Sequence, residues 1–440
     1  MNTMRFDRLT FRAIWAVILL AIAPAFADEP VVQTPPEPRW TIIHAGTLIA
    51  RADRAPLQNQ SIIIKDDRIE KISAGFLTPA EAGLGETTEV IELRDAYVMP
   101  GLIDAHVHLG EAGKFAEKRT DETGVDVYRM LDVIENARKM LDAGYTTVRD
   151  VGGEGWNVIA FRDGVKKGVF AGPRVFSAGH IIHVGTFDQD DSGACYDAAS
   201  CKKAVRRQVE MGADWIKIYA TCSGSKPCGT EFAPGQILPD ELDAIMEAAK
   251  TADIPVAAHA HGTAGINDAL RAGVRSIEHG SYNDKESRAL FKKNGAFYVP
   301  TLAVHDRILA EIGTASPEMK PVMQAFLDTH EARVAAAHEA GVKIAAGSDA
   351  GITPHGKNAR ELYWYVQAGM SEAEALQSAT LVDAALLGKE KDLGSIEAGK
   401  FADIIALAKN PLDDIEALGD VGFVMAGGKV VKSVLSAERH

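Results

Sequence analysis

The chain has 440 residues, of which 46% are apolar and 25% are charged, and its formal net charge is −14. This composition is that of a soluble globular protein and excludes a disordered or fibrous chain. An acidic surface repels nucleic acid and anionic membranes, so neither is an expected partner.

Residues 1–27 have the order of a secretory signal peptide. Three arginines precede an apolar run over residues 13–23, and residues 25–27 (AFA) form a small-residue cleavage signal. The run is too short for a stable membrane span, although an uncleaved anchor is the alternative. We therefore expect an exported protein, periplasmic or secreted, that leaves the membrane after cleavage. Loss of three arginines and one aspartate gives a mature net charge of −16.

Both ends of the mature chain consist of short strands separated by Gly and Asp turns. We interpret residues 28–97 together with residues 394–440 as one small β-sandwich domain built from both termini.

The middle of the chain, residues 98–393, alternates short apolar strands with longer helical patterns such as 240–251 and 263–272. The eight expected strands are one around Ile103 and residues 146–149, 175–178, 215–219, 255–259, 276–279, 297–302 and 343–347. Eight such units predict an α/β fold of the (β/α)8 TIM-barrel type. A doubly wound sheet is the competing fold, but no Gly-rich phosphate loop follows an early strand.

The first of these strands ends in two histidines, within residues 101–108 (GLIDAHVH). His106 and His108 are two positions apart, so their side chains leave the strand on the same face. Two converging imidazoles are half of a zinc-type site.

Four more polar residues lie inside or at the end of apolar strands: Lys217, His259, His279 and Asp349. Each alone has a structural explanation, as a core histidine, a lysine whose stem is buried, or an aspartate that caps a helix. Six such residues on five strands, all at the carboxyl end, instead favour an active site.

These segments resemble the metal-dependent amidohydrolase superfamily. Residues 98–108 look like its first barrel strand, and Lys217, His259, His279 and Asp349 match its ligands on strands four, five, six and eight. Residues 216–220, 259–262 and 277–280 are similar to the prolidase-like branch, which holds Xaa-Pro dipeptidases, other carboxy-terminal dipeptidases and ochratoxin-type amidases.

The resemblance implies two divalent metal ions, with zinc expected and manganese or cobalt as alternatives. His106, His108 and Asp349 would hold one ion, and His259 and His279 the other. Lys217, carboxylated by CO2 to a carbamate, would bridge both. The alternative is an unmodified Lys217 that pairs with Asp349 beside a single metal.

The implied reaction is hydrolysis of an amide by hydroxide formed between the two ions, with Asp349 passing the proton to the departing nitrogen. The expected substrates are dipeptides or N-acyl amino acids, whose leaving group is an amino acid. A lactone or carbamate hydrolase and a non-catalytic periplasmic binding protein are the alternatives. The resemblance is also compatible with a homo-oligomer.

Three further residues are candidates for binding the substrate. His261 follows His259 by two positions, although a histidine there can also cap the next helix. His183 lies where relatives carry Gly-Gly-His-Gly, a pattern that this sequence does not match. Arg149 could bind a carboxylate or pair with Asp150.

Cys195, Cys201, Cys222 and Cys228 are the four cysteines. In an exported chain an even number predicts disulfides, and we favour Cys195–Cys201 and Cys222–Cys228 among three pairings. A second metal site and free thiols are the alternatives, but these spacings do not match zinc–cysteine motifs.

Overall fold

The fold was obtained as a computed structural model, which describes residues 37–111, 125–153, 155–184, 193–221 and 235–435. The chain divides into residues 1–38 and 39–440, and the fold below is that of the second unit. The predicted signal peptide lies outside the described residues. Within the described ranges, no helix has the length and apolar character needed to cross a membrane.

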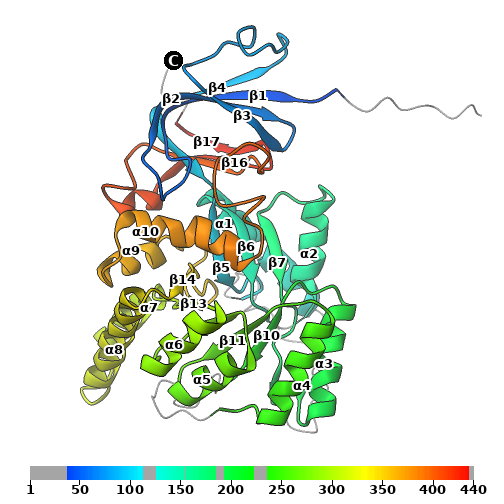
Figure 1. The fold of residues 1–440 in the computed structure, drawn as a ribbon, viewed down its shortest axis with the longest axis vertical. Helices are drawn as coiled ribbons and strands as arrows, with labels where there is room; N and C mark the ends of the chain where they lie inside the picture. Colours follow the sequence, from blue (N-terminus) through cyan, green and yellow to red (C-terminus); the bar gives the residue numbers. More distant parts are fainter. Residues whose placement is uncertain (1–36, 112–124, 154, 185–192, 222–234, 436–440) are drawn as a thin grey trace, which may run out of the picture. The chain divides into compact units, whose positions relative to one another are not determined.

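Eight parallel strands occupy the middle of the chain and form two sheets, one of three strands and one of five. The smaller sheet has the order β5-β6-β7, and the larger has the order β10-β11-β12-β13-β14 (Figure 1). The bounds are β5 (Leu102–Val107), β6 (Tyr145–Asp150), β7 (Arg174–Ser177), β10 (Ile216–Tyr219), β11 (Val256–Ala260), β12 (Ser276–His279), β13 (Phe297–Val299) and β14 (Lys343–Ile344).

Backbone hydrogen bonds connect the two sheets on both sides. Asp214, two residues before β10, donates its N–H to the carbonyl of Ser177 at the end of β7 (2.7 Å). On the other side, Ala105 of β5 donates to the carbonyl of Ala346 (2.8 Å), just after β14. The carboxyl ends of all eight strands therefore border a common space.

The helices between the strands follow ordinary capping rules. α5 (Thr263–Ala272) covers the predicted residues and ends at Gly273, whose φ of 92° is the left-handed conformation that glycine adopts most easily. At the start of α4 (Pro239–Thr251) the Glu241 carboxylate accepts the N–H of Leu238 (2.8 Å). The other helices are α1 (Val125–Asp142), α2 (Asn157–Lys166), α3 (Ala198–Glu210), α6 (Lys285–Asn294), α7 (Val304–Thr314), α8 (Met319–Glu339), α9 (Arg360–Gln367), α10 (Glu372–Gln377) and α11 (Asp383–Leu386).

A seven-stranded sheet combines both ends of the chain, in the order β17-β16-β15-β4-β1-β2-β3. The strands are β1 (Trp40–Leu48), β2 (Leu57–Lys65), β3 (Arg68–Ala74), β4 (Glu89–Pro100), β15 (Ile404–Leu407), β16 (Val421–Ala426) and β17 (Lys429–Ser433). Ile69 of β3 donates its N–H to the carbonyl of Lys400 (2.9 Å), so the β3 edge meets the segment that leads into β15. Ile69 and Met425 of β16 also share one buried apolar cluster.

Two predicted barrel strands end three residues earlier than expected, and one of them is β14, which ends at Ile344 rather than at Gly347. β13 ends at Val299 rather than at Leu302, because Pro300 has no N–H to donate and Thr301 has a φ of 60°, which leaves the extended conformation. This early end turns Thr301 toward the carboxyl side of the strands, where the candidate site lies.

Candidate metal centre

A cavity of about 780 Å³ lies at the carboxyl ends of the parallel strands. Residues that follow or end these strands line it, including His108, Gly152, His180, Lys217, His259, His279, Thr301 and Asp349. Five of the six predicted metal ligands are thus on the cavity wall, and the sixth, His106, is fully buried.

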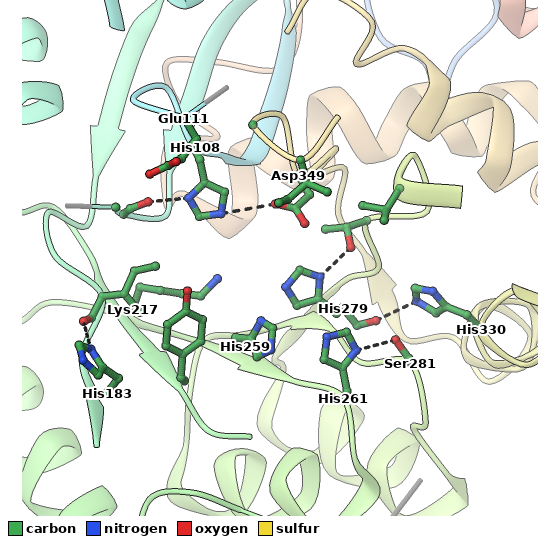
Figure 2. A pocket seen from close by; sticks show the side chains of 18 of the residues that line it. His108, Glu111, His183, Lys217, His259, His261, His279, Ser281, His330 and Asp349 are labelled. Carbon is green, nitrogen blue, oxygen red and sulfur yellow. Dashed lines mark hydrogen bonds and ion pairs between the residues drawn. The ribbon is translucent and has the colours of Figure 1, made fainter. Parts of the chain in front are cut away.

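His106, His108 and Asp349 form one group whose ligand atoms all lie within 4.8 Å of one another. Asp349 Oδ1 is 3.5 Å from His106 Nε2. It is 3.4 Å from His108 Nε2, a pair that Figure 2 marks with a dashed line. Two histidines from β5 and its end therefore meet an aspartate from the segment after β14.

Hydrogen bonds at the opposite ring nitrogens set the proton positions in this group. His106 Nδ1 is 2.8 Å from the Glu278 carboxylate, and His108 Nδ1 is 2.5 Å from the carbonyl of Gly152. Both acceptors take a proton, so in the neutral His106 ring Nε2 carries a lone pair, whereas Asp349 raises the pKa of His108 against the effect of burial. Burial lowers the pKa of His106 to about 4, which keeps that ring neutral.

The lone pair of His106 consequently faces the Asp349 carboxylate, which also pairs with His108 Nε2. His106 Nε2 is buried and has no hydrogen-bond partner among the described residues. Two hydrogen-bond acceptors that face each other in a buried site, with no proton between them, are unfavourable unless a cation lies between them. The donor set of two imidazoles and one carboxylate fits a divalent transition metal.

His259, His261 and His279 form a second group, also with ligand atoms within 4.8 Å of one another. His279 Nδ1 is 2.8 Å from the Thr301 hydroxyl, which itself donates to the carbonyl of Pro300 (2.6 Å). Thr301 therefore accepts the His279 proton and leaves a lone pair on Nε2. Such a bond at the second ring nitrogen is usual for histidines that bind metals.

Lys217 extends toward the space between the two histidine groups (Figure 2). Its side chain is buried (1% exposed), and burial lowers its pKa to about 8. No carboxylate of the described residues lies within the 4.0 Å ion-pair distance of its ammonium nitrogen. The geometry therefore does not favour the alternative in which Lys217 pairs with Asp349.

Glu278 connects Arg149 to the first histidine group. Its carboxylate accepts two hydrogen bonds from Arg149 Nη2 (2.9 and 3.0 Å) and one from His106. Arg149 is fully buried, also donates to the carbonyl of Ala105 (2.5 Å), and is not among the described residues that line the cavity. The expected role of Arg149 in substrate binding is corrected accordingly: its guanidinium holds Glu278, because both lie below the strand ends.

A second buried network joins the first and last strands of the series. Asp104 Oδ1 accepts the N–H groups of His106 (3.0 Å) and Ser348 (3.1 Å). Asp104 Oδ2 accepts the Ser348 hydroxyl (2.6 Å) and the Asn358 amide (2.7 Å). Because Ser348 precedes Asp349, this network sets the position of His106 relative to Asp349.

Three residues of the site have strained backbones. His279, Thr301 and Asp349 have φ angles of 69°, 60° and 54°, in the left-handed region that non-glycine residues rarely adopt. Such strain persists only where the surrounding structure imposes it, and it is concentrated at functional sites. The left-handed backbone at His279 also interrupts the regular alternation of side chains along β12. The neighbouring residues Glu278 and His279 therefore both approach His106.

The other predicted residues have mixed outcomes. His261 and His183 line the cavity, with His261 Nδ1 2.9 Å from the Ser281 hydroxyl. The Cys195–Cys201 disulfide is confirmed and connects β9 (Ala194–Cys195) to α3. Cys222 and Cys228 lie outside the described residues.

Sequence reasoning missed several residues of the site, namely Glu111, Tyr219, Glu278, Thr301, His305 and His330. Tyr219 follows Lys217 by two positions in β10, so strand periodicity was a usable signal for it. His305 and His330 come from helices, and nothing in the strand pattern points to them.

The cavity at the carboxyl ends of the parallel strands is lined by histidines and an aspartate, as in a metal-dependent hydrolase. A comparison of the sequence with protein families identifies the class. Residues 97–431 match the Amidohydrolase family, and the chain belongs to this family.

Individual relatives narrow the assignment. Ochratoxinase from Aspergillus niger is 32% identical over 438 residues, which cover 91% of this chain and 88% of that protein. The crystal structure of a Xaa-Pro dipeptidase with bound methionine in its active site is 35% identical, with a TM-score of 0.79 and coverage of 90% and 100%. The crystal structure of A. niger ochratoxinase is 30% identical, with a TM-score of 0.75 and coverage of 90% and 96%. The predicted prolidase-like branch is thereby confirmed, and the chain is a hydrolase that acts on amide C–N bonds.

Proposed function

We propose that this chain is an exported enzyme with two divalent metal ions that hydrolyses the amide bond of dipeptides or N-acyl amino acids and releases an amino acid. The observation that carries the proposal is the buried lone pair of His106 Nε2, which has no hydrogen-bond partner among the described residues and lies 3.5 Å from the Asp349 carboxylate. The names of the relatives, an ochratoxinase and a Xaa-Pro dipeptidase, support the two substrate classes.

His106, His108 and Asp349 would hold one ion, and His259 and His279 the other, with zinc expected at both positions. When bound, the two ions would lower the pKa of a water molecule and polarise the carbonyl of the scissile amide. His261, the third member of the second group, is held by the Ser281 hydroxyl, and we assign it to substrate contact.

Lys217 would bridge the ions as a carbamate. Formation of a carbamate requires the neutral amine, whose lone pair attacks CO2 while the nitrogen loses a proton. Burial lowers the pKa of Lys217 to about 8, so a useful fraction of the amine is neutral near pH 7. The resulting anion supplies two oxygen ligands where an ammonium would repel a cation.

Asp349 would move the proton. Burial opposes its ionisation, but His108, His106 and Lys217 together outweigh burial and hold the pKa of Asp349 below its usual range. Its carboxylate is therefore ready at neutral pH to accept a proton from the attacking water. Delivery of that proton to the amide nitrogen matters because an amide nitrogen is a poor leaving group until it is protonated.

Three features of the surrounding protein belong to the same proposal. The eight parallel strands would close into a (β/α)8 barrel over residues 98–393, which the hydrogen bonds on both sides of the two sheets support. The seven-stranded sheet would fold on itself as a β-sandwich of residues 28–97 and 394–440. Residues 1–27 would direct export, and the Cys195–Cys201 disulfide agrees with an oxidising compartment.

The proposal is tested by incubating zinc-loaded protein with a panel of dipeptides and N-acyl amino acids and measuring released amino acids by mass spectrometry. We expect hydrolysis that a chelator abolishes and zinc restores, and that Asp349→Asn reduces by about 10²- to 10⁴-fold. Lactones and carbamates in the same panel test the alternative hydrolase. Hydrolysis that survives removal of metal, or no turnover of any amide by the metal-loaded protein, would contradict the proposal.

A further inference from the structure

The backbone of His279 has a conformation that its place in a strand does not explain. The residue ends β12 with a φ of 69°, and Gly280 follows with a φ of 53°, so two successive residues are left-handed. Glycine adopts this region easily, whereas the Cβ of a histidine makes it unfavourable. Contacts with the surrounding protein must therefore hold His279 in this conformation.

The backbone carbonyl of His279 accepts hydrogen bonds from two buried side chains. The Tyr298 hydroxyl on β13 and Nε2 of His330 on α8 each lie 3.0 Å from this oxygen. A carbonyl can only accept, so the hydroxyl and the ring nitrogen both donate. Figure 2 shows the bond from His330 as a dashed line. The oxygen of the strained residue is thus held from a neighbouring strand and from a helix.

Tyr298 also packs against the peptide between residues 279 and 280. Its side chain is fully buried, and a Cβ placed on Gly280 would come within 2.5 Å of the Tyr298 ring. The ring therefore leaves room only for glycine at this position. The Tyr298 hydroxyl is also 3.2 Å from the carbonyl of Gly280. The Asn283 amide donates to that second oxygen (3.1 Å), which leaves the hydroxyl proton to His279.

The imidazole of His279 has a support of its own. The Thr301 hydroxyl lies 2.8 Å from Nδ1, and the ring centroid is 4.5 Å from that of His259. His330 is held in turn by His305, whose Nε2 lies 3.2 Å from His330 Nδ1. The backbone and the ring of His279 are therefore fixed by different residues, and a change at the backbone can be made without touching the ring contact.

We propose that Tyr298 and His330 form a clamp on the carbonyl of His279 and, as positioning residues, hold its imidazole at the second metal position. Rotation of φ to the extended range would turn the Cβ, and the ring would leave the group that it forms with His259 and His261. The inference rests on the proposed function, because it assigns the clamp to one of the two metal positions. Loss of the clamp should weaken that position and spare the first histidine group.

Removing the two donors tests the clamp without requiring turnover. Tyr298→Phe deletes only the hydroxyl, and His330→Phe keeps an aromatic ring but deletes the N–H donor. In crystal structures of the metal-free proteins, His279 should be left-handed in the wild type and extended in the Tyr298→Phe/His330→Phe double variant. His330→Gln, whose amide nitrogen can donate from the place of Nε2, should keep the wild-type conformation.

Metal affinity gives the second arm of the test. Zinc binding can be measured by competition with a chromophoric chelator, and cadmium-113 NMR of the cadmium-loaded proteins resolves the two positions. We expect Tyr298→Phe and His330→Phe each to weaken the binding of one ion about 10- to 100-fold. Each should also shift one cadmium resonance, the one that His259→Ala abolishes.

Tyr365→Phe is the matched control for these variants. It deletes an equally buried hydroxyl, which donates to the carbonyl of Ala345 (2.8 Å), and neither residue is part of the described cavity lining. The control should keep both metal affinities even where it lowers the stability of the fold.

Three results would overturn the clamp. They are an unchanged His279 conformation in the double variant, equal weakening of both ions, and a loss of metal affinity in Tyr365→Phe as large as that in Tyr298→Phe. If His279 moves in the double variant as expected but the wild type binds fewer than two ions, the clamp stands and the proposed two-metal function fails. The two failures are therefore distinguishable.

Discussion

The Glu278 carboxylate lies 2.8 Å from Nδ1 of His106 and also holds the buried guanidinium of Arg149. This single carboxylate directs the lone pair of His106 toward Asp349 and keeps Arg149 away from the cavity. The binding of metal at the first histidine group therefore depends on a residue that does not bind the metal.

Replacing Glu278 by glutamine should weaken metal binding at the first group. The amide offers one acceptor where the carboxylate serves both His106 and Arg149, so His106 loses its fixed orientation. We expect the metal affinity of one site to fall about 10- to 100-fold, measured by competition with a chromophoric chelator. Glu89→Gln, an exposed change on β4, is the matched control. Unchanged affinity in Glu278→Gln would show that the contact does not orient His106.

The Asp104 network leads to a separate prediction about stability. In Asp104→Asn, an amide group would face donors from Ser348, Asn358 or the His106 backbone, so at least one buried donor loses its acceptor. The free energy of unfolding should fall by about 1–3 kcal/mol, measured by urea denaturation. Asp420→Asn, at an exposed position, is the control. Equal stability of Asp104→Asn and wild type would mean that the network does not hold these strand ends together.

Glu361 should make stability depend on pH. It is buried and accepts the N–H groups of Leu302 (3.0 Å) and Ala303 (2.6 Å), and burial raises its pKa to about 8 from the ordinary 4.5. The folded state therefore binds the proton more tightly than the unfolded state. This contribution is fully present below pH 4.5 and is lost as the pH rises toward 8.

Glu361→Gln removes this titration while keeping the shape of the side chain. Urea denaturation at about pH 5 and about pH 8 should show a smaller loss of stability with pH in the variant than in the wild type. Parallel pH dependence in the two proteins would mean that Glu361 does not change its protonation state on folding in this range.

The Cys195–Cys201 disulfide should contribute to stability near the rim of the cavity. Val184 of β8 (His183–Val184) pairs with Cys195 of β9, so the disulfide ties the short ribbon that carries His183 to α3. The Cys195→Ala/Cys201→Ala double variant should lose roughly 2 kcal/mol of unfolding free energy, as expected for closure of a short loop. An unchanged melting curve would indicate that the ribbon is held by other contacts.

The strands and most of the metal centre were predictable from the sequence, because both follow from local patterns. β12 has the predicted bounds, and His106, His259 and Asp349 were identified by their places at the ends of apolar strands. Periodicity places side chains on faces, and parallel strands bring their carboxyl ends together.

The remaining features depend on contacts between distant residues. Arg149 reaches Glu278 across 129 positions, and no local pattern predicts that the pair lies below the site rather than in it. The left-handed backbone at His279, with a φ of 69°, has no signal in the strand pattern. His305 lies on α7, which follows β13 along the chain, and His330 on α8 donates to the carbonyl of His279 at the end of β12, so both positions depend on how the helices are placed.

The most direct test of the central claim is the metal content of the active enzyme, measured by inductively coupled plasma mass spectrometry in wild type and in Lys217→Ala. The account predicts two ions per chain in the wild type, and a loss of metal together with activity in Lys217→Ala. Full activity with one ion or none, or a Lys217→Ala variant that keeps two ions and full activity, would contradict the bridged two-metal centre.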